Sequence, residues 1–450
     1  MLGPQLHGEV VEINDERYDE VRAVVNVAHQ SRPLAVVRCL DGDDVAATVR
    51  FATAAGLPLA VRAGGHSADG FGSVEAGVVI DLRPIDYVHV DPQRGVVAIG
   101  GGALARTVDR TTHEFGLATT TPTVSTVGMA GFALSGGISH LTRTYGLAVD
   151  NLIGADVVLA DGSTVRADAD GDEDLLWALT GGGGNFGIVT ELRMRLHPVS
   201  TVTGGPMLFP LEHTEPLLRL FRDWIPPQPE DISAFIALLT VPPQGPFPEH
   251  MLGRPACALI WCNTAAPARS EAALDTFRAE RPLLDAVREV PYPILQTSFD
   301  TAASAGKYAH LTGLLYRDLP DEAGTQFERW GASQPTPACT THLYPLDGAA
   351  SRPGPAHTAW PWREAAFAQM NAANATIPGT QDQLQEWACG FRDALRPYAL
   401  PGCYANFQMN EGPERALACY GANSDRLSEL KRRYDPDNVF HRNQNITPAP

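Results

Sequence analysis

Short apolar runs separated by an amphipathic segment mark the first folded unit of the chain. Residues 33–40 (PLAVVRCL) and 57–65 (LPLAVRAGG) are runs of the kind that form buried strands. Between them, residues 42–56 (GDDVAATVRFATAAG) have acidic residues first, apolar residues at helical spacing and a closing glycine, which predicts a capped amphipathic helix. Two further β-branched runs, residues 77–85 and 95–103, indicate more strands. We therefore expect a small β-α-β unit whose strand ends in a glycine loop, a position that phosphate sites favour.

The pattern changes twice further along the chain. Residues 154–167 (GADVVLADGSTVRA) predict a hairpin turning at Asp161-Gly162. From about residue 201, apolar strands alternate with amphipathic helices, which predicts an α+β domain with an antiparallel sheet. The clearest strands are 258–263, 339–346 and 365–374, and the clearest helices are 270–280 and 381–398. The tail, residues 434–448, is polar with proline and asparagine, and we expect an ordered loop.

Composition narrows the class of protein. The 450 residues are enough for two or three domains, and a net charge of −18 makes nucleic acid an improbable partner, since phosphate backbones would repel the chain. Neither a membrane-spanning run nor a secretion signal is present in the sequence, so we expect a soluble cytoplasmic protein. Seven scattered cysteines without a CxxC pair predict neither a zinc site nor a disulfide framework, and we expect no metal.

Three glycine-rich segments carry the candidate chemistry: residues 62–67 (RAGGHS), 128–137 (GMAGFALSGG) and 181–187 (GGGGNFG). Glycine lets a ligand approach the main chain, whose N–H groups bind phosphate. Neither a P-loop nor an early GxGxxG is present. Three loops from one half of a protein suit a long ligand with a central pyrophosphate, such as FAD. From these residues alone, His66 is a nucleophile, a ligand or an uncommitted loop residue.

Six segments in this order resemble the FAD-linked oxidases of berberine bridge enzyme type, within the vanillyl-alcohol-oxidase-like, PCMH-type flavoproteins. They are residues 62–67, 136–152, 174–190, 292–300, 404–407 and 430–446. The resemblance covers most of the chain. It implies an α+β fold with a two-lobed FAD-binding domain at residues 1–200 and a substrate domain with a large antiparallel sheet at 201–404. Residues 405–450 then return to the FAD-binding domain.

The resemblance assigns a covalent bond to His66, from a ring nitrogen to the 8α-methyl group of the flavin, and neutral imidazole is a competent nucleophile for that bond. Many relatives add a cysteinyl link to C6, but Val124 stands at that position, so we expect a single link. Val127 falls where oxygen access is controlled, and Phe132 where relatives often have a histidine. The expected cofactor contacts are Arg62, Ala63, Gly64, Gly65, His66, Ser67, Val127, Gly128, Gly131, Phe132, Gly136, Gly137, Tyr145, Asn151, Gly187, Ile188, Tyr404 and Asn406.

The proton-transfer residues depart from the family pattern. The motif reads Tyr404-Ala-Asn406-Phe407, so phenylalanine replaces the tyrosine base of sugar-oxidising relatives. The glutamate of alkaloid-oxidising relatives is replaced by Gln369, which can orient a substrate but cannot be a general base. Period-two alternation would place Phe367, Gln369 and Asn371 on one strand face. The candidate catalytic residues are Gln369, Tyr344, His342 and Asn406, and Tyr308 with His310 form another same-face pair.

The expected activity is oxidation of a small organic molecule, more plausibly a secondary metabolite than a sugar, by hydride transfer to flavin N5 and reoxidation by O2 to H2O2. Two alternatives stay open. One is a flavin dehydrogenase, or an oxidative cyclase or oxygenase, and the other is a non-redox cyclase that keeps the flavin as structure. The expected partners are a small-molecule substrate and O2, with neither nucleic acid nor membrane, and the oligomeric state is left open.

Overall fold

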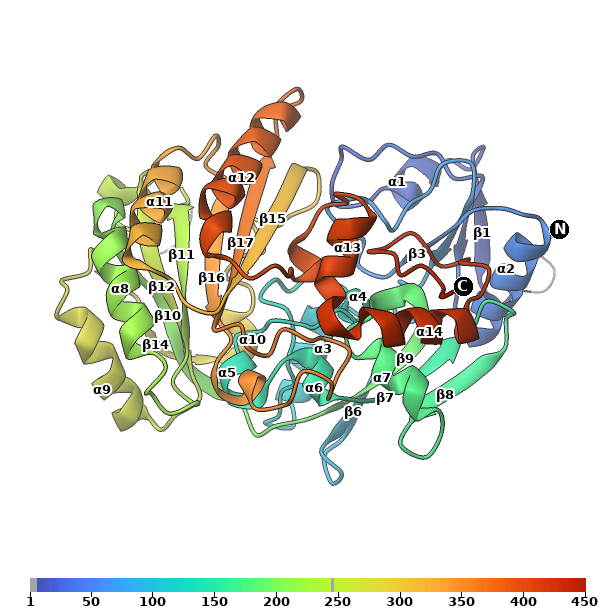
Figure 1. Ribbon diagram of the computed structural model, residues 1–450, viewed down its shortest axis with the longest axis horizontal. Coiled ribbons are helices and arrows are strands. Elements are labelled where there is room, and N and C mark those ends of the chain that lie inside the picture. The colour runs from blue at the N-terminus through green and yellow to red at the C-terminus, as the bar shows by residue number, and fades with distance from the viewer. Residues whose placement is uncertain (1–5, 244–246) are drawn as a thin grey trace.

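The strands of the protein form three sheets in the computed structural model, which describes residues 6–243 and 247–450. Strands up to Arg195 make two small sheets, and strands from Thr201 onward make one large sheet (Figure 1). Within the described ranges, no helix has both the length and the apolar character needed to cross a membrane. The mixed helix and sheet content confirms the predicted α+β class.

The first sheet has the order β1-β2-β4-β3, and β2 and β3 both run parallel to β4. Its strands are β1 (Glu9–Glu12), β2 (Ala35–Arg38), β3 (Leu59–Arg62) and β4 (Val78–Asp81), with helices α1 (Tyr18–Arg22) and α2 (Gly42–Ala54). The α2 helix begins where the Asp41 carboxylate accepts a hydrogen bond from the Asp44 N–H, which satisfies one of the free donors of the first turn. The predicted β-α-β unit is confirmed, and β3 leads directly into the glycine loop at residues 62–67.

The second sheet is antiparallel, with the order β5-β6-β9-β7-β8, and it contains the predicted hairpin as β7 and β8. Its strands are β5 (Val88–Asp91), β6 (Val96–Gly100), β7 (Leu152–Val158), β8 (Thr164–Asp168) and β9 (Ile188–Arg195). The accompanying helices are α3 (Ala105–His113), α4 (Met129–Ala133), α5 (Thr142–Tyr145), α6 (Ala148–Asn151) and α7 (Glu173–Leu179). The Gly183 N–H donates to the Leu134 carbonyl at 2.9 Å, so the glycine segments 128–137 and 181–187 lie beside one another next to this sheet.

The large sheet has eight strands, in the order β13-β10-β12-β11-β16-β17-β15 with β14 paired to β10. They are β10 (Thr201–Pro210), β11 (Ala234–Thr240), β12 (Pro255–Asn263), β13 (Leu284–Asp285), β14 (Arg288–Pro291), β15 (Tyr308–Tyr316), β16 (Thr340–Pro345) and β17 (Phe367–Ala375). The helices of this region are α8 (Thr214–Trp224), α9 (Pro267–Arg278), α10 (Tyr292–Leu295), α11 (Asp321–Ala332) and α12 (Gln381–Leu395). In Figure 1, α8, α9, α11 and α12 cover the outer face of the sheet, while the inner face is turned toward the two small sheets.

Side chains of β17 alternate between these two faces, and this corrects one prediction. Phe367 belongs to the core between sheet and helices, whereas Met370 and Ala372 line a cavity on the opposite face. Gln369 is fully buried on the helix side, where its amide oxygen accepts a hydrogen bond from the Tyr316 hydroxyl and its amide nitrogen donates to Asn371 Oδ1 at 2.8 Å. The expectation that Gln369 lies on the substrate face is therefore wrong by one position along the strand.

The C-terminal segment runs back from the large sheet to the small ones through α13 (Pro413–Tyr420) and α14 (Ser424–Tyr434). One buried cation fixes it there. The Lys431 ammonium donates to the Asn185 carbonyl at 2.7 Å and to the Phe440 carbonyl at 3.0 Å, and it pairs with the Asp435 carboxylate at 2.6 Å. Neither charged side chain is exposed to solvent. The ordered tail loop after residue 434 is confirmed.

We expect Lys431→Met to lower the free energy of unfolding by about 3–5 kcal/mol, because it leaves the Asp435 carboxylate buried without its cation. Urea unfolding followed by tryptophan fluorescence measures this loss. The neighbouring Arg432→Ala is the matched control, since its side chain is exposed and its loss should stay within about 1 kcal/mol. Equal effects of the two substitutions would contradict the role given to Lys431.

Gln369→Leu should lower the free energy of unfolding by about 1–3 kcal/mol, because the buried Tyr316 hydroxyl loses its acceptor. The adjacent Met370→Leu keeps the side-chain volume and faces the cavity, so its effect on stability should stay below about 1.5 kcal/mol. The two urea unfolding curves, measured side by side, decide which face each residue occupies. A larger loss for Met370→Leu would reverse the assignment.

Candidate functional site

A cavity of about 460 Å³ lies where the inner face of the large sheet meets the two small sheets, a volume within the usual range for ligand sites. Segments from the whole length of the chain form its wall. They include the loops at 62–68, 122–138 and 183–189, the segment 299–311, strands β16 and β17, residues 404–408 and the tail at 440–444. All three predicted glycine segments therefore contribute to one site.

The first two glycine loops touch through their main chains. A Cβ atom on Gly64 would lie 2.4 Å from the Gly128 nitrogen, and a Cβ on Gly128 would lie 2.4 Å from the Gly64 nitrogen. No side chain fits at either position, so both must be glycine. Gly65 adds a left-handed φ of +70°, which turns the chain so that His66 enters the cavity wall.

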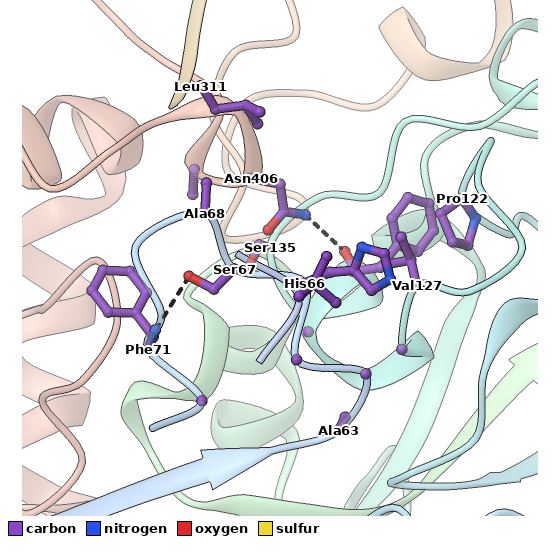
Figure 2. A pocket seen from close by; sticks show the side chains of 18 of the residues that line it. Ala63, His66, Ser67, Ala68, Phe71, Pro122, Val127, Ser135, Leu311 and Asn406 are labelled. Carbon is purple, nitrogen blue, oxygen red and sulfur yellow. Dashed lines mark hydrogen bonds between the residues drawn. The ribbon is translucent and has the colours of Figure 1, made fainter. Parts of the chain in front are cut away.

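His66 offers one ring nitrogen to the cavity. Its Nε2 atom lies 3.0 Å from the Thr126 hydroxyl, and Nδ1 makes no hydrogen bond within the described part of the chain. Burial lowers the pKa of the imidazole to about 4, so the ring is neutral at physiological pH. A neutral imidazole with a free nitrogen is nucleophilic. Figure 2 shows the ring in the wall near Val127 and Pro122, with Asn406 and Leu311 coming from the distant half of the chain.

The wall has the features that a dinucleotide needs. At Gly131 and Gly184 a Cβ would meet nothing within 4 Å, so these two wall glycines leave room that any other residue would partly fill. The main chain of Ala63, Gly64, Gly65 and Ser67 borders the same cavity, as does the stretch from Gly187 to Val189. Main-chain N–H groups and missing side chains are what pyrophosphate binding uses, and FAD fits this wall.

Tyr404 and Asn406, both predicted cofactor contacts, line the cavity and hold its loops together. The Tyr404 hydroxyl oxygen accepts hydrogen bonds from the Gly137 N–H at 2.9 Å and the Ile138 N–H at 3.3 Å, and the Asn406 amide donates to it at 3.0 Å. The Asn406 amide also lies 3.3 Å from the Phe132 carbonyl oxygen, to which it donates. Phe132, Val127 and Ile188 are wall residues as expected.

Four other predicted cofactor contacts lie outside the cavity wall, where they pack against neighbouring residues. Gly136 and Gly137 pack against Tyr404 and Ala148, where a Cβ would be 2.7 Å and 2.2 Å from its neighbour. Tyr145 stacks on His197, with ring centroids 3.9 Å apart.

Asn151, the fourth, donates its amide N–H to the Tyr145 carbonyl at 2.9 Å, and its Oδ1 accepts a hydrogen bond from His197 Nε2 at 2.7 Å. Arg62 borders the cavity, but its buried guanidinium is turned to the Asp81 carboxylate at 3.2 Å and the Val21 carbonyl at 2.6 Å. In this structure these residues support the loops that form the cavity wall.

On the sheet side of the cavity, His342 and Tyr344 share one face of β16, as predicted. The Tyr344 hydroxyl lies 2.6 Å from His342 Nδ1 and 3.4 Å from the Thr123 hydroxyl. Burial lowers the pKa of His342 to about 3 and raises the pKa of Tyr344 above its usual value, so both groups are uncharged. The other predicted pair is less relevant, since His310 lies outside the wall and contacts Cys389 at 3.5 Å.

Phe407, which stands in place of a tyrosine, lies between Tyr404 and Tyr344 of the cavity wall. Its ring centroid is 4.6 Å from that of Tyr404 and 6.0 Å from that of Tyr344. Phe407 therefore has no hydroxyl of its own, but the phenol rings of Tyr404 and Tyr344 lie next to it. Trp261 and Trp360 are buried in the core.

Several wall residues carry no sequence signal that single-sequence reasoning could use. Asn374 and Met370 are ordinary strand residues, and Pro122 lies in a loop between recognised motifs. The tail contributes Arg442, Asn443 and Gln444, which were expected only as part of a terminal loop. The Gln444 carbonyl accepts hydrogen bonds from Asn185 at 3.1 Å and from the Tyr420 hydroxyl at 2.5 Å, which ties the tail to the third glycine loop.

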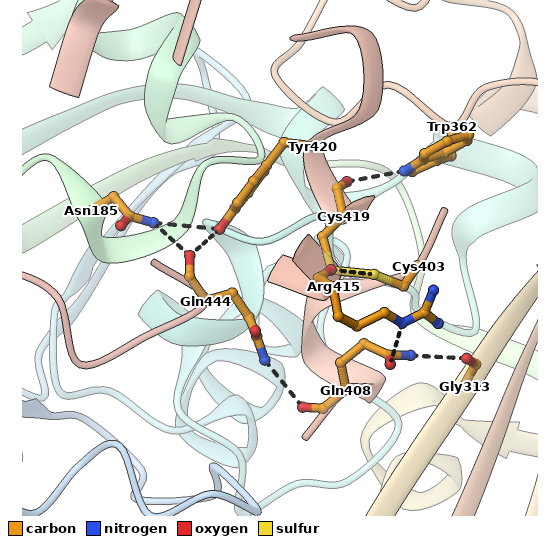
Figure 3. Close-up of a disulfide and its surroundings, with 9 residues drawn as sticks. All are labelled: Asn185, Gly313, Trp362, Cys403, Gln408, Arg415, Cys419, Tyr420 and Gln444. Atoms are coloured by element: carbon orange, nitrogen blue, oxygen red, sulfur yellow. Dashed lines mark hydrogen bonds between the residues drawn. A yellow bond between two sulfur atoms is a disulfide. The ribbon is translucent and has the colours of Figure 1, made fainter. Parts of the chain in front are cut away.

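Within the described chain, a single disulfide between Cys403 and Cys419, which the scattered cysteines did not predict, adjoins this part of the wall (Figure 3). The two residues are 16 apart in the sequence, and scattered cysteines give no pairing until the fold brings them together. The bridge links the segment that carries Tyr404 to helix α13. Trp362 packs beside it, and its indole N–H donates to the Cys419 carbonyl at 3.0 Å.

Two family models match segments near the beginning and the end of the chain, and both segments contribute to the cavity wall. A family model described as an FAD binding domain matches residues 33–168, and one described as berberine and berberine-like matches residues 403–447. The chain is 28% identical to an FAD-linked oxidoreductase of Bacillus subtilis over 99% of this chain and 98% of that protein. It is 38% identical to the (R)-6-hydroxynicotine oxidase of Paenarthrobacter nicotinovorans over 43% of this chain and 42% of that protein.

Solved structures share the fold over the whole chain. The 6-hydroxy-D-nicotine oxidase from Arthrobacter nicotinovorans superposes with a TM-score of 0.87 at 24% identity, covering 100% of this chain and 99% of that one. Berberine bridge enzyme from Eschscholzia californica superposes with a TM-score of 0.86 at 19% identity, covering 99% and 98%. The chain is thus similar to an FAD binding domain over residues 33–168 and to berberine-like proteins over residues 403–447, and it shares the fold of these solved oxidases over its whole length.

Proposed function

We propose that this protein is an oxidase that carries FAD bound covalently through His66 and oxidises a small organic molecule at the expense of O2. The observation that carries the proposal is the His66 imidazole, held neutral in the cavity wall by a glycine loop with Nδ1 free of any hydrogen bond in the described chain. The adjacent glycine loops supply the main-chain surface for the pyrophosphate. FAD, when bound, supplies the two-electron acceptor for a hydride from the substrate.

Several features of the wall support a single covalent link. Val124 lines the cavity where many relatives have a cysteine. No cysteine is among the described residues of the wall, and the unpaired thiols of Cys39, Cys257, Cys262 and Cys339 are buried elsewhere in the described chain. The small side chain of Val127 borders the cavity beside His66, which leaves space for O2 to reach the flavin.

The substrate side of the wall supports oxidation of an organic molecule with an apolar body. Phe299, Leu311, Met370 and Phe407 border the cavity together with His342, Tyr344 and Asn406. We keep His342, Tyr344 and Asn406 as candidate catalytic residues. Gln369 is excluded, because its side chain faces the helices. This wall supports an apolar metabolite as the class of substrate.

The mass of the denatured protein tests the covalent link. Wild type should retain the mass of one FAD and a yellow acid precipitate, and His66→Ala should lose both. The control His89→Ala removes an exposed histidine on β5 and should keep the flavin. If the mass of wild type equals that of the polypeptide alone, the link through His66 is wrong.

Reoxidation by O2 tests the oxidase assignment separately. We expect that flavin photoreduced without air regains its oxidised absorbance when mixed with air-saturated buffer, and that H2O2 accumulates in a one-to-one ratio with flavin. Recovery only after addition of an artificial electron acceptor would make the protein a dehydrogenase instead.

A further inference from the structure

The charged side chains of the cavity wall differ in sign from the protein as a whole. The chain has 52 acidic residues against 34 lysines and arginines, yet neither an aspartate nor a glutamate is among the described residues that line the cavity. Three basic side chains, Arg62, Lys307 and Arg442, border it instead. A wall of this sign attracts anions, so we expect the occupant of the cavity to carry negative charge.

Two of these cations are directed at groups of the protein itself. The buried Arg62 guanidinium pairs with the Asp81 carboxylate at 3.2 Å and donates to main-chain carbonyls. The Lys307 ammonium donates to the carbonyl of residue 301 and to the carbonyl of residue 302, the latter at 2.9 Å. In the described wall, Arg442 is therefore the cation whose donors are left for a ligand.

The Arg442 guanidinium makes neither an ion pair nor a hydrogen bond within the described chain. Its Nε atom is enclosed and lacks a partner, and burial lowers the pKa of the side chain with no neighbouring carboxylate to raise it. The terminal nitrogens are not enclosed in this way, since the residue is only half-buried and borders the cavity. A cation held partly out of water without a counter-charge is costly, and a negatively charged ligand would remove that cost.

Contacts on both sides fix the main chain around Arg442. On one side, the Phe440 carbonyl accepts a hydrogen bond from the Lys431 ammonium at 3.0 Å. On the other side, the Gln444 carbonyl accepts from the Asn185 amide at 3.1 Å. Neither contact involves a ligand, so the protein itself holds Arg442 beside the third glycine loop.

The third glycine loop leaves open main chain next to this part of the tail. Asn185 directly follows Gly183 and Gly184, and all three residues line the cavity. A Cβ on Gly184 would meet nothing within 4 Å, and Gly183 has a left-handed φ of +66°. Main-chain N–H groups without side chains around them favour the close approach of a phosphate. The loop and Arg442 therefore offer a phosphate two complementary kinds of donor.

The surroundings of the tail favour the cofactor over an anionic substrate as the partner of Arg442. Phe440 packs in the core of the first sheet, together with Ile80 of β4 and Ile188 at the start of β9. The wall residues that come from the large sheet, such as Met370, lie on the other side of the cavity. Arg442 is thus grouped with the glycine loops that suit a dinucleotide.

We propose that the Arg442 guanidinium pairs with the pyrophosphate of FAD and so makes the C-terminal tail part of the cofactor site. The proposal rests on the FAD-dependent function above, but it does not require the covalent link. Near neutral pH the rings of oxidised FAD are uncharged, so the pyrophosphate carries the negative charge of the cofactor. A guanidinium offers parallel N–H donors to phosphate oxygens, and such charge-assisted hydrogen bonds are stronger than neutral ones.

Titration of the apoprotein with FAD, followed by flavin fluorescence, tests this pairing. His66→Ala serves as the parent, because its flavin can be removed and added back. Adding Arg442→Gln should raise the Kd for FAD about 10- to 100-fold, the usual effect of losing hydrogen bonds between charged groups. Arg442→Lys should recover part of this loss, since it keeps the charge without the planar fork. Arg432→Gln, the same substitution at an exposed arginine of α14, should bind FAD like the parent.

Two further measurements separate charge pairing from support of the fold. Added salt should weaken FAD binding to the parent more than to the Arg442→Gln protein, because salt screens the pair that the substitution removes. The urea midpoint of the apoprotein should not fall in Arg442→Gln, because the guanidinium has no partner in the described chain.

Each outcome bears on a separate claim. An unchanged Kd for FAD in Arg442→Gln overturns the proposal. A lower urea midpoint of the apoprotein, combined with a salt dependence equal to that of the parent, also overturns it, because Arg442 would then support the fold. An apoprotein that binds no FAD contradicts the proposed function itself. A wild type that releases its flavin on denaturation contradicts only the link through His66, and the same titration of wild-type apoprotein then decides the role of Arg442.

Discussion

The contact between the main chains at Gly64 and Gly128 is the constraint on which the site depends. These two loops belong to different sheets, since Gly64 follows β3 of the first sheet and Gly128 precedes α4 beside the second. Their nitrogens approach so closely that a single methyl group on either would lie 2.4 Å from the other backbone. The contact fixes the floor of the cavity, and His66, two residues beyond Gly64, takes its position from it.

The large sheet supplies the opposite wall through the simple alternation of its strands. On β16 and β17 one set of side chains packs under α11 and α12, and the other set faces the small sheets. The first set gives the sheet its stability and the second gives the site its chemistry. A single strand can therefore carry Gln369, a buried amide on the helix side, next to Met370, which lines the cavity. The two residues face opposite sides of the sheet, so neither role restricts the other.

Much of this arrangement follows from the sequence because local patterns determine it. The α2 helix, the parallel β-α-β unit and the hairpin at Asp161-Gly162 depend on residues close together in the chain. His66 and the three glycine loops were identified by motif, and all three loops border one cavity. Gln369 was misplaced because motif comparison does not fix which face of a strand a residue occupies, and a shift of one residue moves a strand side chain to the other face.

The remaining differences between the predictions and the structure concern contacts between segments that are distant in the chain, and no local pattern encodes such contacts. The pairing of Cys403 with Cys419 requires the turn between residue 404 and α13, and the guanidinium of Arg62 lies on Asp81 only because β3 and β4 are parallel neighbours. Motif residues such as Gly137 and Asn151 hold the loops from outside the wall. A recognised motif thus identifies the residues that a cofactor site needs, but only the fold separates those that face the ligand from those that support them.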